Sequence, residues 1–428
     1  MGQKPAPSDF GGPDRRWRIP PVPAHVSHSF TGAPLLEELS GPLGFALWQT
    51  FRDVQLWTLS PPRERERLFA PGSARTRAVP AEVAGAEAEL RAPLATLRAM
   101  VDDAGAATEE EVGKACAAVS RWAEARGSLA SALAFAEAAA SAAPADAALA
   151  YEAGRLARRL AEYARAETWL LRAAGLGRRS GDWEAYALAF LGMGRLHQQR
   201  GSVPRARKHF LRAMRASHRH GLRDFEGEAM HNLLMLYTES GDLVAAEAWG
   251  REAYRVYGPD HPELPRMAHD LAHVWSLRGF FGRAEAVFRA LLPHFDQPAD
   301  RLFVLSNLVR ATGGAGSRDG YEEAWSAAWD LAGDPGALDS AARSLLDMAR
   351  GAATMGDGRR AAEAAVRCVE VATRRGEAKA QAEAQALLAA LGSGLAGVAD
   401  PGADAPADTL GDALAAEIVE CLNASPRT

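Results

Sequence analysis

The sequence predicts an all-α fold in which pairs of short helices are stacked along the chain. Apolar residues recur at helical spacing over most of the 428 residues, and small residues mark a repeat of 34 to 40 residues. Only 7% of the residues are aromatic, and alanine supplies much of the apolar content. This composition suits thin helical layers better than one deep core, so we expect an extended array of helices.

The clearest repeat runs from Ala187 to Gly221. Its first helix is expected to end at Gly201, and its second carries Ala206, Phe210 and Ala213 on one side. Counted from Ala187, small residues fall at positions 8, 20 and 27, and a large apolar residue falls at position 24. This pattern resembles the tetratricopeptide repeat. The resemblance implies an α-solenoid, a right-handed superhelix of helix pairs that serves as a binding scaffold.

The chain before the repeats divides into two regions. Residues 1–34 are rich in Pro and Gly and are predicted to be disordered. Residues 35–112 are expected to form an N-terminal helical cap and linker, with a helix over 42–59, a linker over 60–79 and one more helix over 80–112. The helix over 42–59 has two apolar rows. We expect it to cap the first repeat, with partner binding or occupation of the groove as alternatives.

Residues 113–376 are predicted to form an array of about seven repeats. The alanines at position 20 are Ala132, Ala166, Ala206, Ala246, Ala284, Ala324 and Ala361. Glycine precedes most of these alanines by five residues. In the second repeat Ala161 stands in place of the glycine, and in the sixth repeat the stretch ATGGAGSRDG indicates an insertion. The fourth repeat, with its connector GPDHP, resembles the extended repeats of kinesin light chains and of bacterial regulatory arrays.

Three segments follow the array. Residues 377–392 are predicted to form a capping helix, 393–408 a linker, and 409–428 a C-terminal helix and tail. Thr409 and Asp412 resemble a capping box at the start of that last helix.

Composition and charge limit the function. The net charge of −5 gives no general attraction to nucleic acid or anionic membranes. The three cysteines lie in apolar helical contexts and are expected to be reduced core thiols. No signal peptide or membrane span is predicted, so we expect a cytoplasmic protein, and the bacterial arrays it resembles suggest a bacterial one.

Position 9 of the first helices carries arginine in five of the seven repeats. Helical geometry places this position on a stripe that faces the concave groove in tetratricopeptide arrays. The candidate binding residues on and beside the stripe are Arg121, Arg155, Arg158, Arg159, Arg195, His231, Asn232, His269, His273, Arg310 and Arg350. They predict a groove that binds an acidic or phosphorylated peptide through charge-assisted contacts. Alternatively, Glu124, Glu152, Glu228 and Glu239 pair with these arginines across repeats.

The stretch from His269 to His273, HDLAH, has the spacing of the HExxH zinc motif but carries Asp in place of the general base Glu. His231 could join these two imidazoles. Because the motif is incomplete and no third ligand is specified, we expect no metal or other cofactor and no enzymatic activity. A zinc hydrolase is a distant alternative.

The sequence therefore predicts a non-enzymatic scaffold or regulator that binds a protein or peptide. A peptide-responsive transcription or signalling regulator with nucleic-acid contact is the alternative, although no helix-turn-helix or aromatic stacking platform is visible. The oligomeric state and the identity of the partner do not follow from the sequence.

Overall fold

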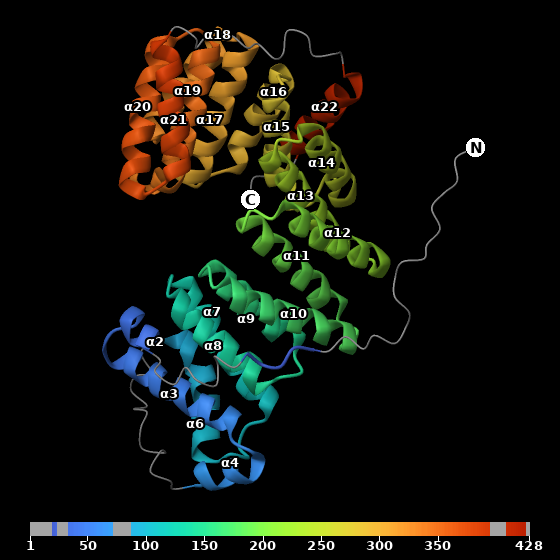
Figure 1. Cartoon of the computed structure of the whole chain (residues 1–428), viewed down its shortest axis with the longest axis vertical. Coiled ribbons are helices and arrows are strands. Elements are labelled where there is room, and N and C mark those ends of the chain that lie inside the picture. The colour runs from blue at the N-terminus through green and yellow to red at the C-terminus, as the bar shows by residue number, and fades with distance from the viewer. Residues whose placement is uncertain (1–18, 24–32, 72–86, 394–407, 425–428) are drawn as a thin grey trace, which may run out of the picture. The chain divides into compact units, whose positions relative to one another are not determined.

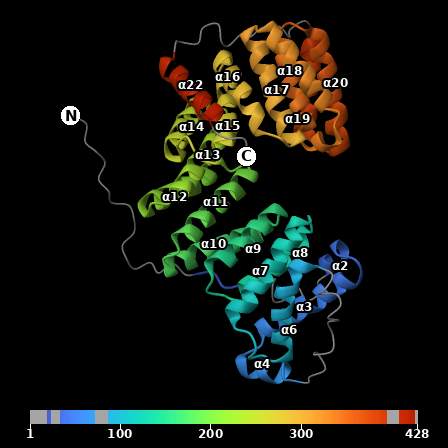
Figure 2. The same ribbon diagram turned by 180° about the vertical axis from the view of Figure 1, so that it is seen from behind.

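The computed structural model of the chain describes residues 19–23, 33–71, 87–393 and 408–424, and every regular element in these residues is a helix (Figure 1 and, from behind, Figure 2). The prediction of an all-α fold is confirmed. The predicted disorder of residues 1–34 lies largely outside the described residues. So does the predicted linker over 393–408, apart from its two end residues.

The N-terminal helices lie against the first helix pair. Their bounds are α2 Ala33–Glu38, α3 Gly41–Leu59, α4 Pro62–Leu68, the 3₁₀ helix η2 Ala88–Leu90 and α6 Arg91–Asp102. The long helix α3 has Pro42 in its first turn and packs against α8, Leu129–Ala142. The Glu38 carboxylate accepts hydrogen bonds from the N–H groups of Ala130 and Ser131, so it caps the start of α8.

Part of the expected linker over 60–79 is helical. Helix α4 begins at Pro62 and has Glu64 in its first turn, and both residues favour the start of a helix. The expectation of a linker was wrong for this stretch.

Seven consecutive helix pairs follow. They are α7 Glu109–Ala125 with α8 Leu129–Ala142, α9 Ala147–Arg159 with α10 Tyr163–Ser180, α11 Trp183–Gln199 with α12 Val203–His220, α13 Arg223–Ser240 with α14 Leu243–Tyr257, α15 Leu264–Leu277 with α16 Phe281–Leu291, α17 Pro298–Ala315 with α18 Arg318–Leu331, and α19 Leu338–Thr354 with α20 Gly358–Arg375. The 3₁₀ helices η3 Leu292–His294 and η4 Pro335–Ala337 lie between pairs, and α21 Ala378–Gly392 and α22 Thr409–Ala424 complete the chain. Helices packed in consecutive pairs confirm the predicted α-solenoid architecture.

The turn inside each pair uses a left-handed residue. Gly201 has a φ of +72°, a conformation that glycine adopts without strain, and Ala161 takes the same place in the second pair with a φ of +59°. In the sixth pair this residue is Gly316, with a φ of +69°. The predicted insertion was therefore wrong, because residues Thr312 to Ala315 form the end of α17.

This correction changes the register of the sixth repeat. Tyr321 follows Gly316 by five residues, as Ala206 follows Gly201, and its side chain is buried. The predicted position-20 residue, Ala324, is therefore one turn further along α18. Arg310 lies six residues before Gly316, so it occupies position 9 without an insertion.

Small residues allow close approach of the helices. A Cβ atom added to Gly194 would lie 2.3 Å from Cε1 of Phe210, so α11 requires glycine where it meets α12. A Cβ atom on Gly313 would lie 2.4 Å from the carbonyl oxygen of Gly351. Helices α17 and α19 thus meet backbone against backbone. Two of the free cysteines, Cys116 and Cys368, are buried as expected, whereas Cys421 on α22 is partly exposed.

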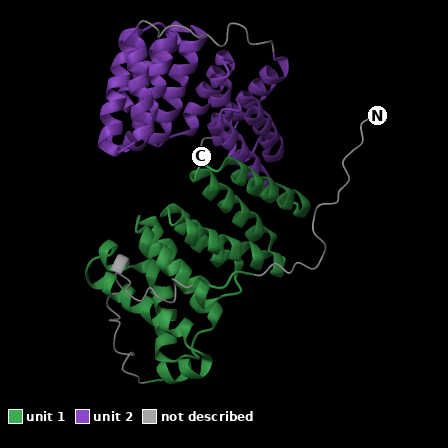
Figure 3. Ribbon diagram, viewed as in Figure 1, with its two compact units in different colours: residues 1–225 green, residues 226–428 purple. Residues whose placement is uncertain are grey.

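The chain forms two compact units, residues 1–225 and 226–428, and each is described by itself below (Figure 3). The boundary falls at the start of α13. Within the described residues, no helix combines the length and the apolar composition needed to cross a bilayer.

Candidate functional site

In the first unit, the structure brings together the candidates on α9 and α11. We call Arg155, Arg158, Arg159 and Arg195 the arginine cluster. Nη1 and Nη2 of Arg155 donate to the two oxygens of Glu124 on α7 at 2.7 and 2.6 Å, and its Nε donates to Glu152 at 2.8 Å. Arg159 also pairs with Glu124. The alternative of pairing across repeats therefore holds for Glu124, whereas Glu152 pairs with Arg155 within α9.

Arg158 lies in a different environment. Burial lowers the pKa of its guanidinium, and the positive charges of Arg195, Arg155 and Arg159 lower that pKa further. Its Nε is buried and has no hydrogen-bond partner among the described residues. Two of the cluster's four guanidinium groups, those of Arg155 and Arg159, thus pair with carboxylates of the same unit. Arg121, the candidate on α7, is exposed.

In the second unit, an aspartate that was not among the predicted site residues organises two candidate histidines. Nε2 of His231 on α13 and Nδ1 of His269 on α15 donate to Oδ2 and Oδ1 of Asp270 at 2.8 and 3.1 Å. Burial raises the pKa of Asp270, but the hydrogen bonds from both histidines outweigh it, and the pKa falls below its usual range. Asn232 donates to the carbonyl oxygen of Glu228, one turn earlier on its own helix.

The third histidine has another partner. Nδ1 of His273 lies 2.8 Å from Oδ1 of Asn307 on α17, so His273 turns toward the next pair and away from Asp270. Burial is the main cause that lowers the pKa of His273 to about 4. The three imidazoles therefore do not converge. Among the described residues, no group of three or more His, Cys, Asp or Glu side chains is placed to hold a metal ion.

The last two candidates share a buried carboxylate. Asp347 on α19 is fully buried and lies 3.3 Å from Nη1 of Arg310 and 3.6 Å from Nη1 of Arg350. Arg343 is a third partner at 3.2 Å, and Arg350 also pairs with Glu383 on α21. In both units the stripe is thus largely engaged in pairs within the protein. That all candidates line one concave groove stays a prediction.

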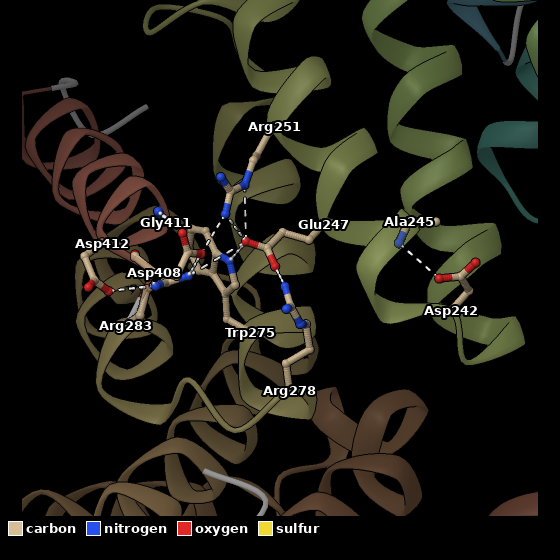
Figure 4. A network of polar contacts seen from close by, with 10 residues as sticks. All are labelled: Asp242, Ala245, Glu247, Arg251, Trp275, Arg278, Arg283, Asp408, Gly411 and Asp412. Carbon is tan, nitrogen blue, oxygen red and sulfur yellow. Dashed lines mark hydrogen bonds and ion pairs between the residues drawn. The ribbon is translucent and has the colours of Figure 1, made fainter. Parts of the chain in front are cut away.

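One polar network was not predicted from the sequence (Figure 4). Glu247 on α14 is buried and pairs with Arg251, Arg278 and Arg283, and it accepts a hydrogen bond from Nε1 of Trp275 at 3.0 Å. Arg283 also binds two aspartates at the start of α22, Asp408 and Asp412. The one indirect signal for this network in the sequence is the acidic residue Asp412 at the start of the predicted last helix.

The capping prediction for that helix needs a correction. Oδ1 of Asp408 accepts the hydrogen bond from the N–H of Gly411 at 3.1 Å, so Asp408 is the capping residue. The carboxylate of Asp412 binds Arg283 instead of closing a capping box with Thr409.

A second contact missed from the sequence involves residues 19–23. Arg172 on α10 donates from Nη1 to the carbonyl oxygen of Pro20 at 2.6 Å and from Nη2 to that of Pro144 at 2.5 Å. Ile19 packs on Gly175, where an added Cβ atom would lie 3.0 Å from its Cγ1. A non-helical segment of the chain is thus held on a repeat helix through its backbone.

The packed pair His197 and His209 predicts a pH dependence of stability. Their ring centroids lie 5.1 Å apart, and Nδ1 of His209 is buried without a partner among the described residues. Burial, followed by the neighbouring charges of His197 and Lys208, lowers the pKa of His209 to about 4. Between pH 6.5 and 4 the unfolded chain therefore binds more protons at this residue, so the free energy of unfolding falls as pH falls.

In the variant His209→Phe, we expect the decrease of the free energy of unfolding at low pH to be smaller by up to about 3 kcal/mol. Urea unfolding at pH 7.5 and 4.5 measures the effect. His218→Phe, an exposed position on the same helix, is the control. A pH dependence unchanged in His209→Phe would contradict the prediction.

Comparison with known proteins supports the fold. No family model matches the chain, and no curated protein matches it by sequence. The crystal structure of the apo form of RapI is similar, with a TM-score of 0.51 and 12% identity over 78% of this chain and 87% of that chain. The structure of a Rap protein complexed with competence and sporulation factor has a TM-score of 0.42 and 12% identity, over 82% of this chain and 96% of that chain.

A third similar structure is a signal transduction ATPase with a tetratricopeptide repeat sensor from Pyrococcus horikoshii. Its TM-score is 0.39 at 13% identity, over 87% of this chain and 54% of that chain. At these identities the likeness concerns the fold alone. The likeness to RapI, together with the helix pairs and their turns, shows that the chain has an all-α solenoid fold of stacked helix pairs.

Proposed function

We propose that this protein is a non-enzymatic scaffold or regulator that binds an acidic protein segment, and that the arginine cluster holds the acidic groups of that segment. The observation that carries the proposal is the environment of Arg158. The positive charges of three other arginines lower the pKa of its guanidinium, and its buried Nε has no hydrogen-bond partner among the described residues. A carboxylate or phosphate bound here would offset the repulsion and accept the unused hydrogen bond.

The contact between Arg172 and Pro20 supports a binding role for the repeat helices of this unit. Nη1 of Arg172 binds a main-chain carbonyl of a non-helical segment, which is a contact that any extended peptide can make. Pro23 of the same segment is buried. The first unit thus already holds one chain segment through its main chain, and it carries the arginine cluster as well.

We expect the double variant Arg158→Ala/Arg195→Ala to bind an acidic peptide at least a hundredfold more weakly than the unaltered protein. Each charge-assisted contact contributes roughly 1.5 to 3 kcal/mol, and two such losses exceed the 2.7 kcal/mol that corresponds to a hundredfold change. The measurement is fluorescence anisotropy with a fluorescein-labelled peptide that contains four consecutive glutamates. Circular dichroism checks that the fold is intact.

The control removes two exposed arginines from α12 of the same unit, in the variant Arg205→Ala/Arg207→Ala. Equal losses of affinity in both double variants would reduce the effect to general electrostatic attraction and contradict the proposal. A labelled oligonucleotide in the same assay addresses the nucleic-acid alternative. Tight binding that weakens steeply with salt would favour that alternative.

A further inference from the structure

The C-terminal helix α22 lies on the side of the second unit formed by α14, α15 and α16. Its buried residues are Gly411, Ala415, Ile418 and Leu422, which recur at intervals of four, three and four and form one stripe. Leu410 on the same helix is 74% exposed. The helix therefore buries one narrow face on the repeats.

The surface beneath α22 carries an excess of positive charge. Arg251, Arg278 and Arg283 surround the single buried carboxylate of Glu247, and the Arg283 side chain is only 3% exposed. Within this network, α14, α15 and α16 therefore contribute three positive charges and one negative charge, an excess of two positive charges. Burying an arginine without a counter-charge is unfavourable, so this surface requires an acidic partner.

Helix α22 supplies the missing charges from its first turn. Nε and Nη2 of Arg283 donate to Oδ1 of Asp412 at 3.0 and 2.8 Å, and its Nη1 donates to Oδ2 of Asp408 at 3.1 Å. Arg251 binds the same oxygen of Asp408 at 2.8 Å. Figure 4 shows both aspartates directed toward Arg283.

The contact also requires a glycine. A Cβ atom added to Gly411 would lie 2.0 Å from Nη1 of Arg283, because the guanidinium lies against the backbone of the first turn. Further along the helix, Tyr254 donates its hydroxyl hydrogen to Oε1 of Glu417 at 2.9 Å, and Nε2 of His294 binds the carbonyl oxygen of Leu422 at 2.9 Å. The surface thus recognises the start, the middle and the end of one helix.

We propose that this surface is a helix-binding site, that α22 occupies it as an internal ligand, and that a partner protein binds by placing a helix of the same chemistry there. The helix would carry Asp-x-x-Gly-Asp in its first turn and small or aliphatic residues that continue the stripe. This site is separate from the arginine cluster of the first unit, so it stands or fails independently of the function proposed above.

The test uses the full chain with the substitution Gly411→Leu, which removes α22 from the site without altering the site itself. The probe is a fluorescein-labelled peptide with the sequence of residues 408–424, in which serine replaces cysteine. We expect Gly411→Leu to bind the peptide at least tenfold more tightly than the unaltered protein, because α22 no longer competes. Adding Arg251→Ala should weaken this binding about tenfold. Arg255→Ala, an exposed position on the same helix, should leave it unchanged.

Hydrogen exchange measures whether Gly411→Leu releases α22 alone or unfolds the second unit. In Gly411→Leu, the amides of residues 409–424 should exchange at least tenfold faster while those of α14 to α16 keep their protection. Equal peptide affinity in the unaltered protein and in Gly411→Leu would overturn the proposal. So would loss of protection throughout the second unit, since α22 would then be an inseparable part of the fold.

Discussion

Replacing Asp347 by alanine is expected to lower the free energy of unfolding by about 3 to 5 kcal/mol. The Asp347 side chain is fully buried between α17 and α19 and faces Arg310, Arg343 and Arg350. Without it, the guanidinium of Arg310, which is only 18% exposed, loses the counter-charge that compensates its desolvation. Solvent screens the more exposed Arg343, so we expect a value near the lower limit.

Urea unfolding followed by circular dichroism measures this loss. The matched control is Asp339→Ala on the same helix, because the Asp339 side chain is 89% exposed and pairs with Arg375 at the surface. Its removal should cost less than about 1 kcal/mol. Equal losses in the two variants would mean that Asp347 contributes no more than a surface ion pair.

The variant Gly351→Ala should lower the free energy of unfolding by about 3 kcal/mol, at the upper end of the usual cost of overpacking. The added methyl carbon would lie 2.7 Å from the carbonyl oxygen of Val309 and 2.8 Å from Cα of Arg310. Both are backbone atoms, so α17 and α19 would have to separate. The same urea titration measures the effect.

Gly358→Ala is the control for this prediction. Gly358 is also helical, but a Cβ atom there would meet nothing within 4 Å. Alanine at this position should be neutral or stabilise the protein by up to about 1 kcal/mol, since glycine is the weaker helix former. A Gly351→Ala variant as stable as the unaltered protein would show that α17 and α19 are not in backbone contact.

The helix pairs could be predicted because their signals are local. A left-handed glycine followed five residues later by a small buried residue marks a turn and the helix after it, as Gly201 and Ala206 do. The sixth repeat misled the prediction because its buried residue is Tyr321, so the nearest alanine, Ala324, suggested an insertion. The turn residue was the better marker of the repeat. The left-handed backbone conformation restricts the amino acid at the turn more than packing restricts the amino acid at the buried position.

The candidate site could be predicted only in part. Position 9 follows from helical geometry, so Arg155, Arg195 and Arg310 could be found from the sequence. Their partners could be found only where both residues lay on the predicted stripe, as for Glu124. Asp347 was missed because an aspartate in a helix usually indicates an exposed position, whereas the Asp347 side chain is buried in α19. Asp270 was considered only as a replaced catalytic Glu, whereas it binds two histidines.

The contacts of Arg172 and Arg283 could not be predicted for a different reason. They join residues 152 and 129 positions apart, and no periodicity links residues over such distances. The repeats specify contacts with the next helix or the next pair. A segment that contacts a distant repeat, whether it precedes that repeat in the chain as Pro20 does or follows it as Asp412 does, lies outside that rule.

These two contacts also predict an order of folding. Ion pairs between neighbouring repeats, such as Arg155 with Glu124, span about one repeat, so they can form as soon as that repeat leaves the ribosome. Pro20 is synthesised early but must wait for Arg172, and Arg283 must wait for Asp408 and Asp412, the last described part of the chain to be made. Until then Glu247 is the one charged partner of Arg283 among the residues that the structure describes. The second unit therefore passes through a nascent state in which its most buried arginine is incompletely neutralised, and synthesis of the C-terminal helix ends that state.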